Sequence, residues 1–276
     1  MIRKHYYCCW AGLLVLSLAC SDSTGPAPVT TSTPTPVTAT VPPLTYDVFV
    51  PEDLAGKKDS VSLLVVLDGG EYSGIARNTA VLYEFGEKIY PTVVVSIPST
   101  PISRWAYFTP THLAADENDT GNQALYPYTG RFGALADFLE QQVLPELAQK
   151  YDLQFYQKTL FGHSMGGLAV LSFIVLRPEV FDHYIAASPS TMYDDHYLFR
   201  TIEDRTERLA FKSLFLTAAR HDSNGYRENV NWLNEYLQKA KPAAQRLELR
   251  IYERETHATS GVKSLIDGLA FVGKNG

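Results

Sequence analysis

A serine flanked by glycines stands in the segment "TLFGHSMGGLAVLSF", which covers residues 159–173. A short apolar stretch precedes the serine and a run with helical spacing follows it, so Ser164 is predicted to occupy a turn between a strand and a helix. This placement is typical of a nucleophilic serine on a strained turn, where Gly162 and Gly166 avoid side-chain collisions. The alternative is a glycine-rich turn in which the serine is incidental.

A serine hydroxyl is a weak nucleophile and needs a base, for which the sequence offers His257. On turns of this kind the partners follow the serine in the order acid, then histidine, at the ends of later strands. His257 lies just beyond the last predicted strand, in "RETHATS", whereas His183 precedes a strand and His196 begins a predicted helix. His163 adjoins the serine but is expected to point away from it, in a structural role. The alternative for His257 is a solvated loop histidine.

The acid that orients the histidine is expected in the loop "ARHDSNGYREN", after the predicted strand 213–218. Asp222 is preferred because it lies nearer the strand end, where a carboxylate can orient the far nitrogen of the imidazole. Glu228 stays open as the alternative, although it lies where a helix is predicted to begin. An acidic residue is favoured there by the helix dipole alone.

Two main-chain N–H groups are expected to stabilise the oxyanion of a tetrahedral intermediate. One belongs to Met165, directly after the candidate nucleophile. The other is expected in "LDGGEY", where consecutive glycines allow the backbone to approach a substrate closely. Gly70 is the preferred second donor and Gly69 a further candidate, while an ordinary tight turn is the alternative.

Candidate substrate-binding residues lie in the long region 98–130, which is expected to be irregular. Trp105 and Tyr107 would suit an aryl or catechol-bearing ester, and Arg104 could pair with an anionic group. The alternative is that these aromatic rings pack the region onto the domain. The acidic stretch "ADEND" at 115–119 would repel a strongly anionic ligand.

The elements that must position these residues alternate between apolar strands and amphipathic helices. This alternation predicts one α/β domain over 44–276, with a mainly parallel central sheet, helices on both faces and no large lid. Strands are expected at 44–50, 62–68, 92–97, 158–162, 184–189, 213–218 and 246–253, and helices at 74–89, 131–151, 165–176, 228–240 and 260–272.

The N-terminal region has a different composition. Residues 1–19 resemble a secretory signal peptide, and "LSLAC" resembles a bacterial lipobox that would make Cys20 the lipidated residue. Residues 20–43 are rich in Thr and Pro and are expected to form a disordered tether. The protein is therefore expected in the bacterial cell envelope, attached to the outer membrane through its lipid anchor, with secretion after simple cleavage as the alternative.

Composition excludes some classes of function. The net charge is −6 and no basic stripe is present, which argues against nucleic-acid binding. All three cysteines lie in the first twenty residues, and no metal-ligand cluster, nucleotide loop or cofactor motif is seen. We therefore expect no metal and no cofactor, with a small-molecule ester as the partner. The oligomeric state is left open.

From about Tyr46 to its end, the chain resembles the esterase D-like α/β hydrolases, in the branch of predicted hydrolases related to enterochelin and salmochelin esterases. The stretches that carry the resemblance include "YDVFVPED", "LLVVLDGGEY", "YFTPTH", "LFGHSMGGLAVL", "RPEVFDHYIAASPS" and "THATS". The resemblance implies a serine hydrolase that uses Ser164 and His257, with "LDGG" beside the oxyanion hole. The turn "ARHD" departs from an acidic "GE"-like turn of the branch, which leaves the acid open.

The function expected from these features is hydrolysis of carboxylic esters through an acyl-enzyme intermediate. Acyl transfer to an alcohol and cleavage of an enterobactin-like siderophore are the enzymatic alternatives. A lipoprotein that uses an inherited hydrolase fold only for binding is the non-enzymatic one. It is disfavoured because the serine, the histidine and the glycine turns occur in the expected order.

Overall fold

The computed structural model describes residues 40–52, 54, 60–114, 121–222, 225–240 and 245–274. The predicted signal peptide, Cys20, residues 20–39 of the predicted tether and the acidic stretch 115–119 lie outside the described residues. Within the part that is described, no helix combines the length and hydrophobicity needed to cross a bilayer.

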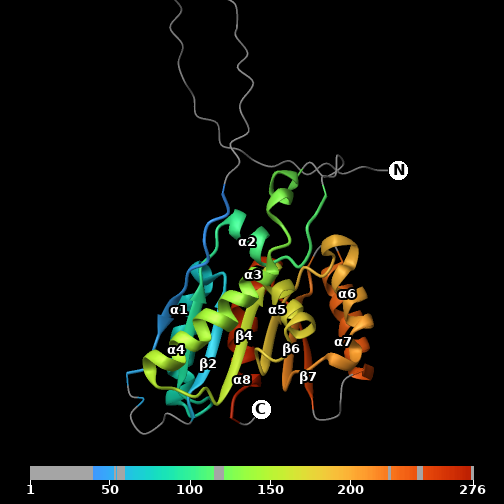
Figure 1. Ribbon diagram of the computed structural model, residues 1–276. Helices are drawn as coiled ribbons and strands as arrows, with labels where there is room; N and C mark the ends of the chain where they lie inside the picture. Colours follow the sequence, from blue (N-terminus) through green and yellow to red (C-terminus); the bar gives the residue numbers. More distant parts are fainter. Residues whose placement is uncertain are drawn as a thin grey trace, which may run out of the picture. The chain divides into compact units, whose positions relative to one another are not determined.

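The described strands form one seven-stranded sheet in the order β1-β3-β2-β4-β5-β6-β7 (Figure 1). The edge strand β1 runs antiparallel to β3, and every other neighbouring pair is parallel. The strands are β1 (Asp47–Phe49), β2 (Ser62–Leu67), β3 (Thr92–Ile97), β4 (Gln157–His163), β5 (His183–Ala187), β6 (Ser213–Ala219) and β7 (Arg246–Tyr252). Parallel pairing aligns the carboxyl ends of six strands at one edge of the sheet, where ligand sites form in such folds.

Helices connect successive parallel strands (Figure 1). They are α1 (Gly69–Phe85), α2 (Pro101–Tyr107), α3 (Phe132–Asp137), α4 (Leu144–Tyr151), α5 (Met165–Leu176), α6 (Tyr193–Asp204), α7 (Tyr226–Ala240) and α8 (His257–Phe271). A π-helical segment, Phe138–Val143, joins α3 to α4, and short 3₁₀ segments occupy Gln123–Tyr128 and Thr206–Arg208.

Side chains of the interior strand β2 alternate between two cores. Leu63 and Val65 belong to the core beneath α3, α4, α5, α6 and α7, while Leu64 and Val66 belong to the core beneath α1 and α8. Both faces of the sheet are therefore buried, which explains why β2 is apolar at nearly every position. The predicted α/β fold with helices on both faces is confirmed. Between β5 and β6 the chain forms only α6 and a 3₁₀ turn, and no lid is inserted there.

Several helices differ from those expected. Helix α1 begins at Gly69 instead of residue 74, because the glycines of "LDGG" belong to its first turn. Helix α2 lies in the region expected to be irregular, where Thr100 and Ser103 form a capping box and Pro101 occupies the first turn. The helix predicted over 131–151 is divided by the π-helical segment that precedes α4 and Pro145, since proline cannot donate the usual backbone hydrogen bond.

Candidate active site

The turn that carries Ser164 is strained. Ser164 lies between β4 and α5 with φ 57° and ψ −113°, a combination that a residue with a side chain rarely adopts. A Cβ atom at Gly162 would lie 2.3 Å from the carbonyl oxygen of Gly166, so the turn cannot accept a side chain there. The Ser164 N–H donates to the carbonyl of Ala187 on β5, 2.9 Å away, and this bond holds the turn against the sheet. Strain of this kind persists where the surrounding structure enforces it, often at functional sites.

The structure brings Asp222, and not Glu228, to His257. Nδ1 of His257 lies 2.9 Å from Oδ1 of Asp222, whose side chain is fully buried. Oδ2 of Asp222 accepts hydrogen bonds from the Ala219 N–H (2.8 Å) and the Ser188 hydroxyl (2.9 Å). Burial raises the pKa of Asp222, but the hydrogen bonds from His257, Ala219 and Ser188 outweigh it, so the pKa lies below its ordinary value. The ionised carboxylate accepts a hydrogen bond from the Nδ1–H of His257. This bond keeps the imidazole proton on Nδ1, so Nε2 is the nitrogen that can take a proton.

Glu228, the alternative acid, occupies the first turn of α7. Its side chain is 60% exposed and contacts the guanidinium of Arg227, its neighbour in the chain. The early position in the helix is the one that the dipole favours, as expected from the sequence.

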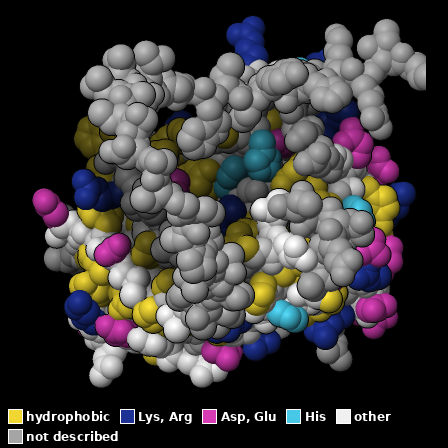
Figure 2. Space-filling model, turned by 90° about the horizontal axis from the view of Figure 1, so that it is seen from above, with side chains coloured by type: hydrophobic (Ala, Val, Ile, Leu, Met, Phe, Trp, Pro, Cys, Tyr) yellow, Lys and Arg dark blue, Asp and Glu magenta, His cyan; other side chains and the backbone are white. Residues whose placement is uncertain are grey.

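Contacts through Ser190 and Tyr226 connect the imidazole with the serine. Oγ of Ser164 lies 3.3 Å from Oγ of Ser190, and the Ser190 hydroxyl lies 3.1 Å from the hydroxyl of Tyr226. The Tyr226 ring packs on the His257 ring, with the centroids 4.5 Å apart. Among the described residues the Ser164 hydroxyl thus bonds to Ser190 and not to His257. Figure 2, which looks onto this end of the sheet, shows a recessed histidine side chain bordered by hydrophobic ones.

His163 is buried behind the site and holds His257 through its main chain. Nε2 of His163 lies 2.7 Å from the carbonyl oxygen of His257 and donates to it, and the two rings lie 4.8 Å apart. Burial, and next the repulsion from His257, lower the pKa of His163 to about 4. His163 is therefore neutral and structural. His257 itself begins α8, three residues before the predicted start at 260, because Thr256 and Thr259 form a capping box there.

The predicted oxyanion donors both lie in first turns of helices. Met165 is the first residue of α5 and Gly70 the second residue of α1, and N–H groups at such positions have no acceptor within the helix. A Cβ atom at Gly69 would lie 2.9 Å from Cβ of Ser96 on β3, so Gly69 is required by packing. A Cβ at Gly70 would meet no atom within 4 Å, which leaves its exposed backbone accessible.

Arg104 has an internal partner. Its Nε lies 2.9 Å from both carboxylate oxygens of Asp68, and its Nη2 lies 3.0 Å from the carbonyl oxygen of His163. Asp68, which precedes α1 in a left-handed conformation, also accepts from the Ser99 hydroxyl. The expected pairing of Arg104 with an anionic substrate group therefore does not fit, because the guanidinium already joins the "LDGG" loop to the end of β4.

The two other candidate substrate-binding residues differ in their surroundings. Tyr107 is buried in the core and its hydroxyl donates to the carbonyl of Pro42, 3.0 Å away, so it does not line the pocket beside the serine. Trp105 does line this pocket, with its ring 6.0 Å from that of Tyr126. The pocket holds about 480 Å³ and is lined by Trp105, Leu113, Ala114, Asn122, Tyr126, Met165, Ser190, Met192, Tyr193, Asp194, Asp195 and Tyr226.

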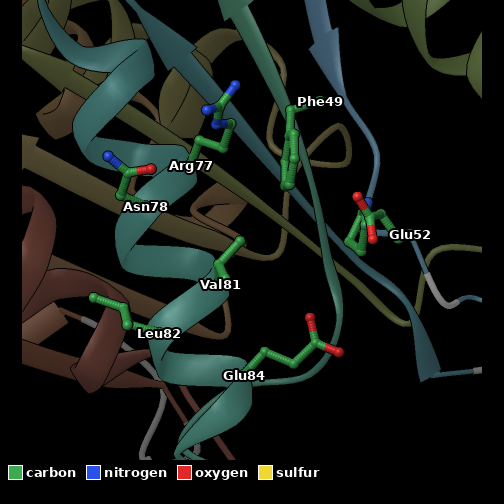
Figure 3. A pocket seen from close by; sticks show the side chains of 8 residues that line it. Phe49, Glu52, Arg77, Asn78, Val81, Leu82 and Glu84 are labelled. Carbon is green, nitrogen blue, oxygen red and sulfur yellow. The ribbon is translucent and has the colours of Figure 1, made fainter.

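A larger hollow of about 870 Å³ lies elsewhere, between α1 and the edge strand β1 (Figure 3). Phe49, Arg77 and Val81 are among the side chains around it. None of the residues predicted to act on an ester lines this hollow. The smaller pocket, which includes Met165, is thus the one that belongs to the predicted site.

Sequence reasoning missed four residues of the site, namely Ser188, Ser190, Tyr226 and Ser260. Ser188 and Ser190 come from "SPS", directly after β5, and hydrogen-bond the predicted acid and the predicted nucleophile. Ser260 donates to the carbonyl of His257 and lies 3.0 Å from the Ser188 hydroxyl. The position of "SPS" at the carboxyl end of a parallel strand was the signal that could have identified the two serines.

Comparisons with known proteins identify the family of the chain. The family model described as "Putative esterase" matches residues 40–268. Ferri-bacillibactin esterase BesA of Bacillus subtilis (strain 168) is 33% identical over 75 residues, which cover 27% of this chain and 26% of the relative. The match thus spans about a quarter of the length of that curated relative.

Solved structures share the fold. The BES protein of Bacillus cereus superposes with a TM-score of 0.72 and 21% identity, covering 83% of this chain and 90% of that one. An IroE-like serine hydrolase from Shewanella oneidensis superposes with a TM-score of 0.71 and 24% identity, covering 83% and 75%. With the family model matching most of the chain and the α/β-hydrolase fold present, the chain belongs to the esterase family.

Proposed function

We propose that the protein hydrolyses carboxylic esters through an acyl-enzyme intermediate, with Ser164 as nucleophile, His257 as general base and acid, and Asp222 as the residue that orients the imidazole. The observation that carries the proposal is the hydrogen bond from Nδ1 of His257 to the buried carboxylate of Asp222, beside a serine on a strained turn. A base oriented in this way and a nucleophile exposed by such a turn are the parts that acyl transfer needs.

The first step requires a rotation of the nucleophile. The Ser164 hydroxyl, which rests on Ser190, turns toward Nε2 of His257 and gives up its proton as it attacks the ester carbonyl. Catalytic hydrogen bonds are often long without substrate and tighten when it binds. The N–H groups of Met165 and Gly70 are our proposed donors to the oxyanion.

In the second step the protonated His257 gives its proton to the leaving alcohol, and the carbonyl bond re-forms to leave an acyl group on Ser164. A water molecule then loses a proton to His257 and attacks the acyl carbonyl. The proton returns to Oγ of Ser164 as the carboxylic acid leaves, so the enzyme is regenerated.

The proposal is tested with p-nitrophenyl butyrate and the full chain. We expect turnover that is abolished in Ser164→Ala, and labelling of Ser164 by a fluorophosphonate. Ser172→Ala is the matched control, because Ser172 is a buried serine of α5 whose hydroxyl donates to a backbone carbonyl of that helix. If the wild type turned over no faster than Ser164→Ala, or if the probe labelled neither protein, the proposal would be refuted.

Cleavage of a siderophore ester is a second candidate. It is favoured by the relatives' names: besides ferri-bacillibactin esterase, a siderophore triacetylfusarinine C esterase of Aspergillus fumigatus is 39% identical over 59 residues. Acyl transfer remains an alternative outcome of the same assay. Adding an alcohol acceptor and analysing the products by mass spectrometry distinguishes an ester product from the free acid.

We also propose, from the sequence, that the protein is exported to the bacterial cell envelope and anchored through lipidated Cys20. Cys20→Ala is expected to abolish incorporation of labelled palmitate, with Cys9→Ala as the matched control. Equal labelling of wild type and Cys20→Ala would contradict the anchor.

A further inference from the structure

The pocket beside Ser164 has an acidic lining. Its lining, drawn from the described part of the chain, includes Asp194 and Asp195 and no Lys, Arg or His. Met165 and Ser190 also line it, and Oγ of Ser190 lies 3.3 Å from Oγ of Ser164. A group bound in the pocket would therefore lie next to the ester carbonyl under attack.

The two carboxylates have different partners. Asp194 accepts a hydrogen bond from the Thr111 hydroxyl, 2.7 Å away, and no cation pairs with its carboxylate among the described residues. Arg200 contacts the main-chain oxygens of both aspartates, but of the two carboxylates it reaches only that of Asp195, which is 96% exposed. Of the two, Asp194 is therefore the carboxylate that has no paired cation in the described part of the chain.

Four aromatic rings complete the lining, from Trp105, Tyr126, Tyr193 and Tyr226. The hydroxyl of Tyr193 donates to the carbonyl of Thr111 (2.7 Å), and that of Tyr226 bonds to Ser190 (3.1 Å). Because these hydroxyls already have protein partners, the two tyrosines offer the ligand mainly ring surface. The electron-rich faces of aromatic rings attract cations, and tryptophan does so most strongly.

The backbone holds Asp194 in place. Asp194, Asp195 and His196 occupy left-handed conformations, with φ of 48°, 47° and 58°. Such conformations are uncommon in residues with side chains and best tolerated by Asp, Asn and His. The segment is held in this conformation beside the pocket by hydrogen bonds. They run from the Thr111 hydroxyl to the Asp194 carboxylate and from Arg200 to the main chain.

We propose that this pocket selects esters that carry an alkylated ammonium group, with Asp194 as the counter-charge and Trp105 as an aromatic contact; this inference rests on the proposed ester hydrolysis. An alkylated ammonium needs no ring of hydrogen-bond acceptors, only negative charge and aromatic surface, which the lining supplies. A strongly anionic ester would face the Asp194 carboxylate without a cation to offset it.

The test compares two esters of the same shape, acetylcholine and 3,3-dimethylbutyl acetate, in which a quaternary nitrogen replaces a quaternary carbon. We expect kcat/KM to be roughly tenfold higher for acetylcholine, the size of a partly desolvated cation–π contact with a nearby carboxylate. The preference is expected to shrink as salt is raised, since salt screens the charge.

The matched variants are Asp194→Asn and Asp195→Asn. Asparagine keeps the side-chain shape and tolerates the left-handed backbone, so mainly the charge is changed. The acetylcholine preference should fall several-fold in Asp194→Asn and stay within about twofold in Asp195→Asn, whose carboxylate is exposed and already paired. If Asp194→Asn is not recovered folded, Trp105→Leu should lower the same ratio by removing the ring.

Equal kcat/KM for the two esters in the wild type would overturn the inference, as would a ratio that Asp194→Asn leaves unchanged. Hydrolysis of p-nitrophenyl butyrate, measured in parallel, distinguishes failure of the cation pocket from failure of the proposed ester hydrolysis. Turnover of that ester with no preference for acetylcholine would refute only the cation pocket, whereas no turnover of any ester would refute the proposed function along with it.

Discussion

Replacing Asp222 with asparagine tests the site most directly, because the hydrogen bonds around the carboxylate dictate the outcome. Oδ2 accepts from the Ala219 N–H, which can only donate, so the amide oxygen of the introduced asparagine must occupy that position. The amide NH₂ then faces Nδ1 of His257, where Oδ1 lay at 2.9 Å. Since this NH₂ donates, His257 must accept at Nδ1 and carry its proton on Nε2. An imidazole in that tautomer cannot take the proton of Ser164.

We expect kcat/KM of Asp222→Asn to fall by about ten-thousandfold, the loss seen when an asparagine imposes the wrong tautomer on such a histidine. This loss corresponds to about 5.5 kcal/mol of transition-state stabilisation, at about 1.4 kcal/mol per tenfold. The fold should persist, because each hydrogen bond keeps a partner. We expect the free energy of unfolding to fall by only about 1–2 kcal/mol, for the lost charge on those bonds.

The assay is hydrolysis of p-nitrophenyl butyrate, with urea unfolding of the same samples and Glu228→Gln as the control. Glu228→Gln should change kcat/KM by less than about twofold, because Glu228 lies in solvent against Arg227. Asp222 would not be the residue that orients His257 if Asp222→Asn stayed folded and kept activity within about tenfold of the wild type, or if Glu228→Gln caused the larger loss.

Two further predictions concern the residues that support the site. Arg104→Met leaves the carboxylate of Asp68 buried without its cation and should lower the free energy of unfolding by about 3 kcal/mol, as measured by urea titration. Adding Asp68→Asn to this variant should recover part of the loss. A double variant less stable than Arg104→Met alone would contradict the prediction. The pKa of His163 is about 4 in the folded protein and near 6.5 in the unfolded chain. As the pH falls from 6.5 to 4, only the unfolded chain therefore binds a proton at this residue. The free energy of unfolding should drop by about 2 kcal/mol between pH 7 and pH 5 for this reason. His163→Gln keeps a donor for the His257 carbonyl but does not titrate. In urea titrations at the two pH values, its drop in free energy of unfolding should be about 2 kcal/mol smaller than that of the wild type. Equal drops in the two proteins would contradict the lowered pKa of His163.

The fold and the turn of Ser164 could be predicted because their causes are local. Apolar runs that alternate with segments of helical periodicity predict a parallel sheet with both faces covered. Gly162 is required because a Cβ atom there would collide with the carbonyl oxygen of Gly166, only four residues along the chain. The segment from Pro101 to Tyr107 was expected to be irregular because the long region 98–130 around it is rich in Pro, Thr and Asn. A local capping box that includes Ser103 overrides that suggestion.

The partners of individual side chains were decided only by the tertiary structure. Whether Asp222 or Glu228 contacts His257 depends on the path of the loop after β6. The sequence gives the order of these residues but not the path of the loop. Arg104 was expected to face a ligand and instead neutralises Asp68, 36 positions away, because a buried carboxylate must be paired. The spacing of residue types thus determines which chemistry the chain can perform. The packing of distant strands and loops determines which groups meet, since burial requires each polar atom to find a partner wherever the fold places one.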